Sequence, residues 1–177
     1  RRFFRYDPNT PLLEAVNVAA PQRAGAIPAL GWVYIPVAEM IAEKAIINCV
    51  IGLHATGGST NHLLHLVAIA HAAGIDLRWE DFGDLAGAIP LLARVYPNGS
   101  ADVNHFHAAG GMGFLMQELL AAGLLHGDVA TVMGQGLSAY TQEPWLDNGQ
   151  LGWRPVPSHS ADTALLRPVA YPCSPGA

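Results

Sequence analysis

The sequence is poor in charged residues. Lys, Arg, Asp and Glu make up 13% of its 177 residues, about half the share that is usual in soluble domains. Only nine residues are Lys or Arg and the net charge is −5, which argues against a nucleic-acid partner because phosphate binding relies on clustered basic side chains. Hydrophobic residues make up 51%, enough for one folded domain with a core. A surface with so little charge is expected to be covered in part by something else.

Cysteines and long apolar runs are also scarce. The two cysteines, Cys49 and Cys173, stand far apart and outside any C-x-x-C spacing, which argues against a zinc ribbon or a disulfide framework. We expect Cys49 to be a small core residue because it lies in an apolar run. No run reaches the roughly 20 apolar residues of a membrane-spanning helix, since Glu39, Glu43 and Lys44 interrupt the best candidate. These absences favour a cytoplasmic protein without disulfides or membrane spans.

Helical and short extended segments alternate along the chain. Apolar periodicity predicts helices over residues 11–20, 36–53, 60–73 and 111–122. The segment 60–73 is apolar nearly all round, so we expect it to be buried. Short β segments are expected over 75–79 and 128–133, and 89–96 is either a strand or a short helix. Over 141–177 Pro and Gly multiply, which predicts an irregular tail. The pattern indicates an α/β fold with more helix than strand.

A glycine break separates two of the expected helices. Gly57 and Gly58 permit positive φ and close approach of other groups to the backbone. Ser59, Thr60 and Asn61 follow them and are residue types that cap helix N-termini. The stretch therefore predicts a new helix whose free amides and hydroxyls favour an anion. The alternative is an ordinary cap on a pair of packed helices.

Other kinds of active site find little support. No lysine follows the glycines as in a Walker loop, and a G-x-S-x-G elbow is absent. His62 and His65 can share a helix face, but they lack the H-E-x-x-H frame of zinc proteases. We therefore predict no metal site among the residues of this chain. Asp102 is placed to orient His105.

Several separate stretches, in the right order, carry a family resemblance that extends from about residue 11 to residue 172. They are Ala55-Thr-Gly-Gly-Ser-Thr-Asn-His62, Tyr96-Pro-Asn-Gly99, Ala101-Asp-Val-Asn-His-Phe106, Ala108-Ala-Gly-Gly111, Glu118-Leu-Leu-Ala-Ala-Gly-Leu-Leu-His126 and Glu143-Pro-Trp-Leu-Asp-Asn-Gly149. Together they resemble the family of dihydroxy-acid dehydratases and 6-phosphogluconate dehydratases. The stretches after residue 95 resemble the 6-phosphogluconate branch in particular.

The resemblance implies a function for a longer protein. It implies a hydro-lyase that dehydrates 6-phosphogluconate to 2-keto-3-deoxy-6-phosphogluconate in the Entner–Doudoroff pathway, as a cytoplasmic homodimer. It implies a 4Fe–4S cluster as Lewis acid, with Mg²⁺ as a further candidate cofactor. The family's cluster-binding cysteines and catalytic serine correspond to positions outside this chain. We therefore expect an inactive, internal segment of the N-terminal, cluster-containing domain, with 141–177 leading toward a C-terminal domain.

Within the chain, the resemblance and the glycine break together indicate a binding role, and they leave the catalytic residues unknown. The expected substrate-binding residues are Gly57, Gly58, Ser59, Thr60, Asn61 and His105, and the expected ligand is a sugar-acid phosphate. Two alternatives stay open. One is another dihydroxy-acid or sugar-acid dehydratase of the same family. The other is a protein without catalysis, in which the turn binds an anion or serves only helix packing.

Overall fold

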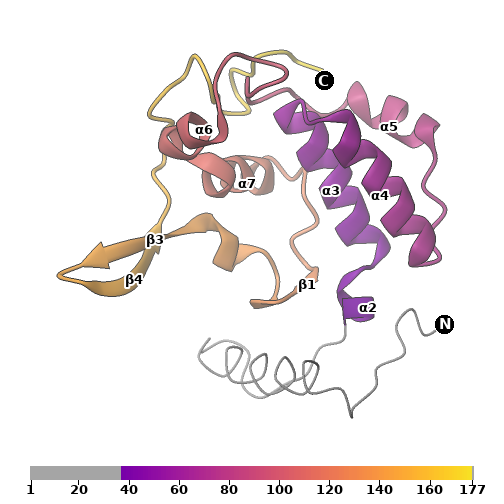
Figure 1. The fold of residues 1–177 in the computed structure, drawn as a ribbon, viewed down its shortest axis with the longest axis horizontal. Helices are drawn as coiled ribbons and strands as arrows, with labels where there is room; N and C mark the ends of the chain where they lie inside the picture. Colours follow the sequence, from indigo (N-terminus) through magenta and orange to yellow (C-terminus); the bar gives the residue numbers. More distant parts are fainter. Residues whose placement is uncertain (1–36, 177) are drawn as a thin grey trace, which may run out of the picture.

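The computed structural model describes residues 37–176, and the helix expected over residues 11–20 lies outside this range. The elements are α2 (Val37–Met40), α3 (Glu43–Thr56), α4 (Thr60–Ala72), α5 (Trp79–Ala86), α6 (Val103–Ala109), α7 (Gly111–Ala121), β1 (Ala130–Thr131), β2 (Gly134–Gln135), the 3-10 turn η1 (Ser138–Thr141), β3 (Gln142–Asp147) and β4 (Gln150–Pro155). Helices α3 and α4 lie side by side, and the β3–β4 hairpin projects away from the helices (Figure 1).

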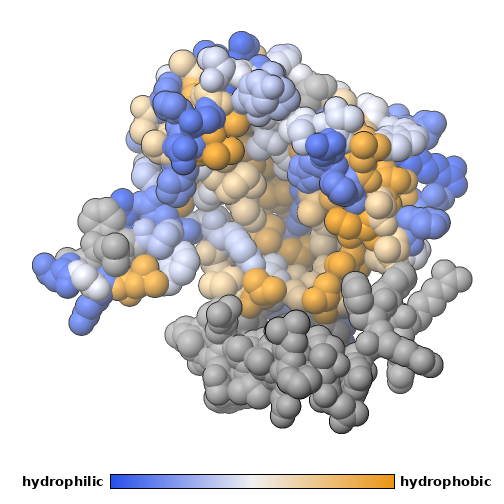
Figure 2. All heavy atoms as spheres, in the orientation of Figure 1, coloured by the Kyte–Doolittle hydropathy of each residue, from blue (hydrophilic) through white to orange (hydrophobic). Residues whose placement is uncertain are grey.

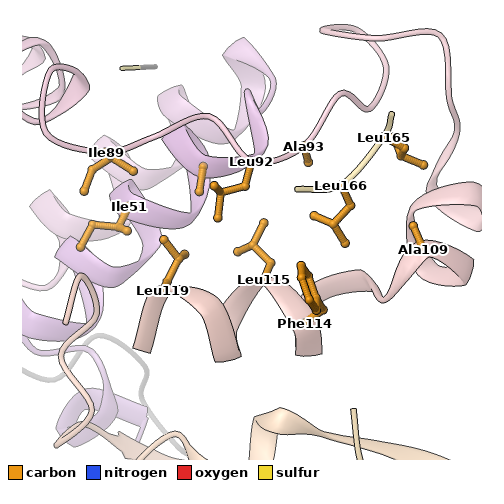
Figure 3. Close-up of a cluster of buried hydrophobic side chains, with 11 residues drawn as sticks. Ile51, Ile89, Leu92, Ala93, Ala109, Phe114, Leu115, Leu119, Leu165 and Leu166 are labelled. Carbon is orange, nitrogen blue, oxygen red and sulfur yellow. The ribbon is translucent and has the colours of Figure 1, made fainter. Parts of the chain in front are cut away.

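Helix α3 lies between two hydrophobic clusters. The first joins it to α7 and to the chain after β4 (Figure 3), and its buried members are Ile51, Ala55, Ile89, Leu92, Ala93, Ala109, Phe114, Leu115, Leu119, Leu165 and Leu166. The second joins it to α4 and α5, and its buried members are Ile46, Val50, Leu53, Leu66, Ala70, Leu77 and Phe82. Burial of each Leu or Phe side chain stabilises the fold by about 1.5–3 kcal/mol. Helix α3 contributes to both clusters and therefore joins them.

The segment 89–95 crosses the first cluster as extended chain. The amide N–H groups of Leu92 and Ala93 both donate to the carbonyl oxygen of Ala55, at 2.8 and 3.1 Å. Arg94 N–H donates to the carbonyl of Leu165 at 2.8 Å. The isolated bridges of the segment 89–95 lead to three different places in the chain, so this segment joins no regular sheet. The extended alternative predicted for 89–96 is the one observed.

The sheets are small and antiparallel. Within residues 37–176 they are β1 with β2 and β3 with β4. After the hairpin the chain returns to the helices, and Leu166 is fully buried beside α7. Helices thus dominate and the sheets are minor, which confirms the predicted fold class, a helix-rich α/β segment. Among the described residues no helix is both long enough and apolar enough to cross a membrane.

Helix α4 is less buried than its composition predicts. Only Leu66 and Ala70 are buried along it, while Leu64 is 50% exposed and Ile69 44%. Hydrophobic residues accordingly reach the surface over α3 and α4 (Figure 2). The prediction of a buried helix was wrong because α4 packs on α3 along one face and nothing among residues 37–176 covers the other. The prediction that Cys49 is a core residue was wrong for the same kind of reason, since it is exposed on α3.

Two expected elements have different boundaries. The helix predicted over 36–53 is divided into α2 and α3, with extended backbone at Ala42, and no glycine or proline marks this break. The β segment predicted over 75–79 is absent. Ile75 N–H instead closes the end of α4 by donating to the carbonyl of Ala70 at 2.8 Å, and Asp81 accepts from Arg78 N–H at 2.7 Å to begin α5.

His54 lies near the end of α3, under α5. Its ring centroid is 6.3 Å from that of Phe82, and its Nε2 atom is buried without a hydrogen-bond partner among the described residues. Burial lowers the pKa of His54, and a hydrogen bond to the backbone of Phe82 opposes this shift only in part. The imidazole is therefore neutral at physiological pH.

This burial predicts a pH dependence of stability. As pH falls below the ordinary histidine value of 6.5, the unfolded state takes up the proton first. The free energy of unfolding should therefore fall with pH until the lower folded-state pKa is reached. NMR titration of the His54 ring, with the signal assigned from its absence in His54→Gln, checks the shift. A midpoint at or above 6.5 would contradict it.

The close packing of the 94–99 turn predicts a selective effect of glycine substitution. A Cβ at Gly99 would overlap the carbonyl group of Arg94, whereas one at Gly83 in α5 would meet no atom within 4 Å. We expect Gly99→Ala to destabilise the protein by about 1–3 kcal/mol and Gly83→Ala to stabilise it by about 0.5–1 kcal/mol. Denaturant unfolding of both variants tests the contrast, and equal stabilities would refute the packing described for this turn.

Candidate anion-binding pocket

A pocket of about 340 Å³ lies where α3 ends and α4 begins. It is lined by Leu53, His54, Gly57, Gly58, Ser59, Thr60, Leu63, Leu91 and Asn98. Four of the six predicted binding residues are therefore in its wall. This volume is within the range of about 300–1,000 Å³ that is typical of small-molecule sites.

Local chemistry builds the first wall as the sequence predicts. Gly57 adopts a left-handed conformation with φ 58° and ends α3, donating its N–H to the carbonyl of His54 at 3.1 Å. Gly58 N–H donates to the carbonyl of Leu53 at 2.9 Å. Ser59 then caps α4, because its Oγ accepts from His62 N–H at 3.2 Å. The predicted order of helix, glycine break and capped helix is confirmed.

The start of α4 offers hydrogen-bond donors to the pocket. Ser59 Oγ accepts the capping bond, which leaves its own O–H able to donate. The amide of Thr60, a lining residue, belongs to the first turn, where a helix supplies no carbonyl partner. The helix dipole adds about half a positive charge at this end. Together these groups favour an anionic ligand.

A second wall comes from a distant part of the chain. Asn98 and Leu91 lie directly against Gly57, where a Cβ would overlap the Asn98 amide nitrogen and lie 2.8 Å from its Cγ and 3.1 Å from Leu91 Cδ1. Gly57 is therefore needed for its positive φ and for this close approach. Asn98 was not among the predicted binding residues, although it belongs to the motif Tyr96-Pro-Asn-Gly99.

The pocket has no charged side chain in its wall. No lining residue is Asp, Glu, Lys or Arg. Burial keeps His54, the lining imidazole, in its neutral form. The partial charge of the α4 N-terminus therefore dominates the local field, and it is matched better by one carboxylate than by a doubly charged phosphate, which usually needs Arg or Lys.

The other two predicted binding residues are placed differently. Asn61 is in the first turn of α4 but does not line the pocket. His105 lies on α6, also outside the pocket wall, and its side chain is 71% exposed. Asp102 caps α6 and holds this histidine, because its Oδ1 accepts from His105 N–H at 3.0 Å and lies 2.8 Å from His105 Nδ1. These bonds to His105, the backbone bond first, lower the pKa of Asp102.

Side chains of the types that bind metals are dispersed over residues 37–176. No group of three or more His, Cys, Asp or Glu side chains there is close enough together to hold a metal ion. Cys49 is exposed on α3, and Cys173 follows the hairpin with its Sγ 3.5 Å from the carbonyl of Leu92. These residues do not fit an iron–sulfur cluster, which needs several converging thiolates.

Comparison with known proteins gives strong matches. The family model described as dihydroxy-acid/6-phosphogluconate dehydratase, N-terminal, matches residues 16–140. A phosphogluconate dehydratase from Pseudomonas aeruginosa is 54% identical over 95% of this chain and 28% of its own length. One from Rhizobium meliloti is 59% identical over 94% of this chain and 28% of its own length.

A dihydroxy-acid dehydratase from Polaromonas is more distant. It is 39% identical over 76% of this chain and 22% of its own length. The chain thus spans about 28% of the length of the two phosphogluconate dehydratases. The matches confirm the family resemblance seen in the motifs, and the chain belongs to the dihydroxy-acid/6-phosphogluconate dehydratase family.

Proposed function

We propose that this chain is part of a phosphogluconate dehydratase and forms one side of its substrate pocket. The observation that carries the proposal is that sequence identity is higher with phosphogluconate dehydratases than with a dihydroxy-acid dehydratase. Identity is 54% and 59% over nearly the whole chain with two phosphogluconate dehydratases, against 39% over 76% with a dihydroxy-acid dehydratase. The full protein would convert 6-phosphogluconate to 2-keto-3-deoxy-6-phosphogluconate. It would act in the cytoplasm as a homodimer.

The proposed reaction removes water from C2 and C3 of the acid. A base takes the C2 proton, the C3–O bond breaks, and the departing hydroxyl takes up a proton to leave as water. The resulting enol loses its O–H proton and takes up a proton at C3, which gives the 2-keto acid. Neither a base for this step nor the ligands of a 4Fe–4S cluster or Mg²⁺ is assigned within residues 37–176. Those groups would be supplied by other parts of the protein.

The role that this chain can fill is binding. The Ser59 and Thr60 hydroxyls and the free amide of Thr60 would hold the substrate carboxylate. The apolar side chains of Leu53, Leu63 and Leu91 would exclude water around it, which strengthens each hydrogen bond. Holding C1 in this way would fix C2 and C3 next to the reacting groups.

Charge at position 59 tests the binding role in the full-length enzyme. Asn and Asp cap helices about as well as Ser, so Ser59→Asn and Ser59→Asp should both keep the stability of α4. Only Ser59→Asp places a negative charge against the carboxylate. We expect its KM for 6-phosphogluconate to rise at least about tenfold over that of Ser59→Asn, the equivalent of about 1.4 kcal/mol. Equal KM values in the two variants would show that the turn serves only helix packing.

Substrate choice tests the branch of the family. We expect the full-length enzyme to dehydrate 6-phosphogluconate with a far higher kcat/KM than 2,3-dihydroxyisovalerate or unphosphorylated gluconate. Parallel steady-state kinetics on the three acids give the answer. A preference for dihydroxyisovalerate would support the alternative that the Polaromonas match suggests, a dihydroxy-acid dehydratase. Turnover of none of the three would favour an anion-binding role without catalysis.

A further inference from the structure

Asn98 is the polar side chain in the second wall of the pocket. It reaches this position from the turn after the extended segment 89–95, about forty residues beyond the glycine break. A Cβ at Gly57 would overlap the side-chain amide nitrogen of Asn98, so the amide lies directly beside the glycine break. Ser59, Thr60 and Asn98 line the same pocket, so a ligand that fills it can contact both walls.

A short relay of hydrogen bonds fixes the orientation of Asn98. Its Nδ2 donates to the carbonyl of Ala93 at 3.0 Å. Ala93 N–H in turn donates to the carbonyl of Ala55, in the last turn of α3, at 3.1 Å. Gly99 N–H donates to the carbonyl of Val95 at 3.0 Å and closes the turn behind the side chain. The amide is thus tied to the same helix end that carries the first wall.

This arrangement leaves one side of the amide available. The bond to Ala93 uses one of the two Nδ2 hydrogens. Oδ1 accepts no hydrogen bond within the described residues, and Asn98 is exposed toward solvent. Oδ1 is a pure acceptor, so it suits a ligand O–H and would repel a carboxylate or phosphate oxygen. The donors of α4 suit a carboxylate, and the acceptor of Asn98 suits a hydroxyl group. Together they favour an acid that also carries hydroxyl groups.

We propose that Asn98 positions a hydroxyl group of the substrate and makes the pocket selective for polyhydroxy acids over acids with an alkyl chain. The proposal rests on the proposed function, with the carboxylate at the start of α4. A hydroxyl on C4 or C5 of the substrate donates to Oδ1, and the bond to Ala93 keeps the acceptor in place. An analogue that lacks this hydroxyl leaves Oδ1 without its partner.

Kinetics on the full-length enzyme test the assignment through a double-mutant cycle. The substrates are 6-phosphogluconate and its 4-deoxy and 5-deoxy analogues, and the enzymes are wild type, Asn98→Ala and Leu91→Ala as a control in the same wall. In wild type we expect one analogue to lose about tenfold in kcat/KM, the size of one neutral hydrogen bond. In Asn98→Ala that loss should shrink to about twofold or less, while Leu91→Ala should keep it.

A merely structural role predicts a different pattern. Loosening of the turn would lower kcat/KM for all three substrates by the same factor and leave the wild-type discrimination in place, which would overturn the proposal. If Asn98→Ala fails to fold, Asn98→Ser takes its place in the cycle, and less than about twofold wild-type discrimination against both analogues excludes a hydroxyl contact in either case. If the wild-type enzyme does not turn over 6-phosphogluconate, the proposed function itself is wrong. If it does, but Asn98→Ala leaves the penalty for the deoxy analogue unchanged, only the role of Asn98 is wrong.

Discussion

The carbonyl oxygen of Ala55 joins the extended segment 89–95 to the end of α3. It lies in the last turn of α3 and accepts two amide hydrogens from the extended segment, those of Leu92 at 2.8 Å and Ala93 at 3.1 Å. Because the glycine break follows two residues later, this carbonyl ties the second wall of the pocket to the first. All three of these residues are completely or almost completely buried, where an unpaired carbonyl would cost about 1–3 kcal/mol. The geometry of the pocket thus depends on the packing of the core beneath it.

The pocket combines a local element with a distant one, and each contributes a different chemistry. The helix start supplies donors and a partial positive charge, and the turn after the extended segment supplies an acceptor. Glycine is what allows the two to meet, since a side chain at Gly57 would occupy the place of Asn98. Neutral groups throughout make such a site selective by hydrogen-bond geometry more than by net charge.

The sequence predicts the local parts of this structure well and the long-range parts poorly. The turn from Gly57 to Ser59 follows from residue types whose backbone preferences act within a few positions. Asn98 escaped the site prediction because its position depends on the contact between the extended segment and α3, which no local pattern encodes. The burial of α4 was overestimated because an apolar composition does not specify which neighbour covers which face. Residues 142–155 show no strong strand period, so the β3–β4 pairing was missed, although Asn148-Gly149 between the strands is a residue pair typical of a tight hairpin turn.

After the β3–β4 hairpin the chain returns to the core between α3 and α7, and this return shows where the structural unit ends. The family match stops at residue 140, yet Leu165 and Leu166 fill the cluster between α3 and α7, and Arg167 N–H donates to the carbonyl of Leu92 at 2.8 Å. A boundary drawn at the end of the match would therefore cut through a core and leave a cavity beside Phe114. Sequence families and folding units are delimited by different criteria, and here the hairpin is an excursion within one unit.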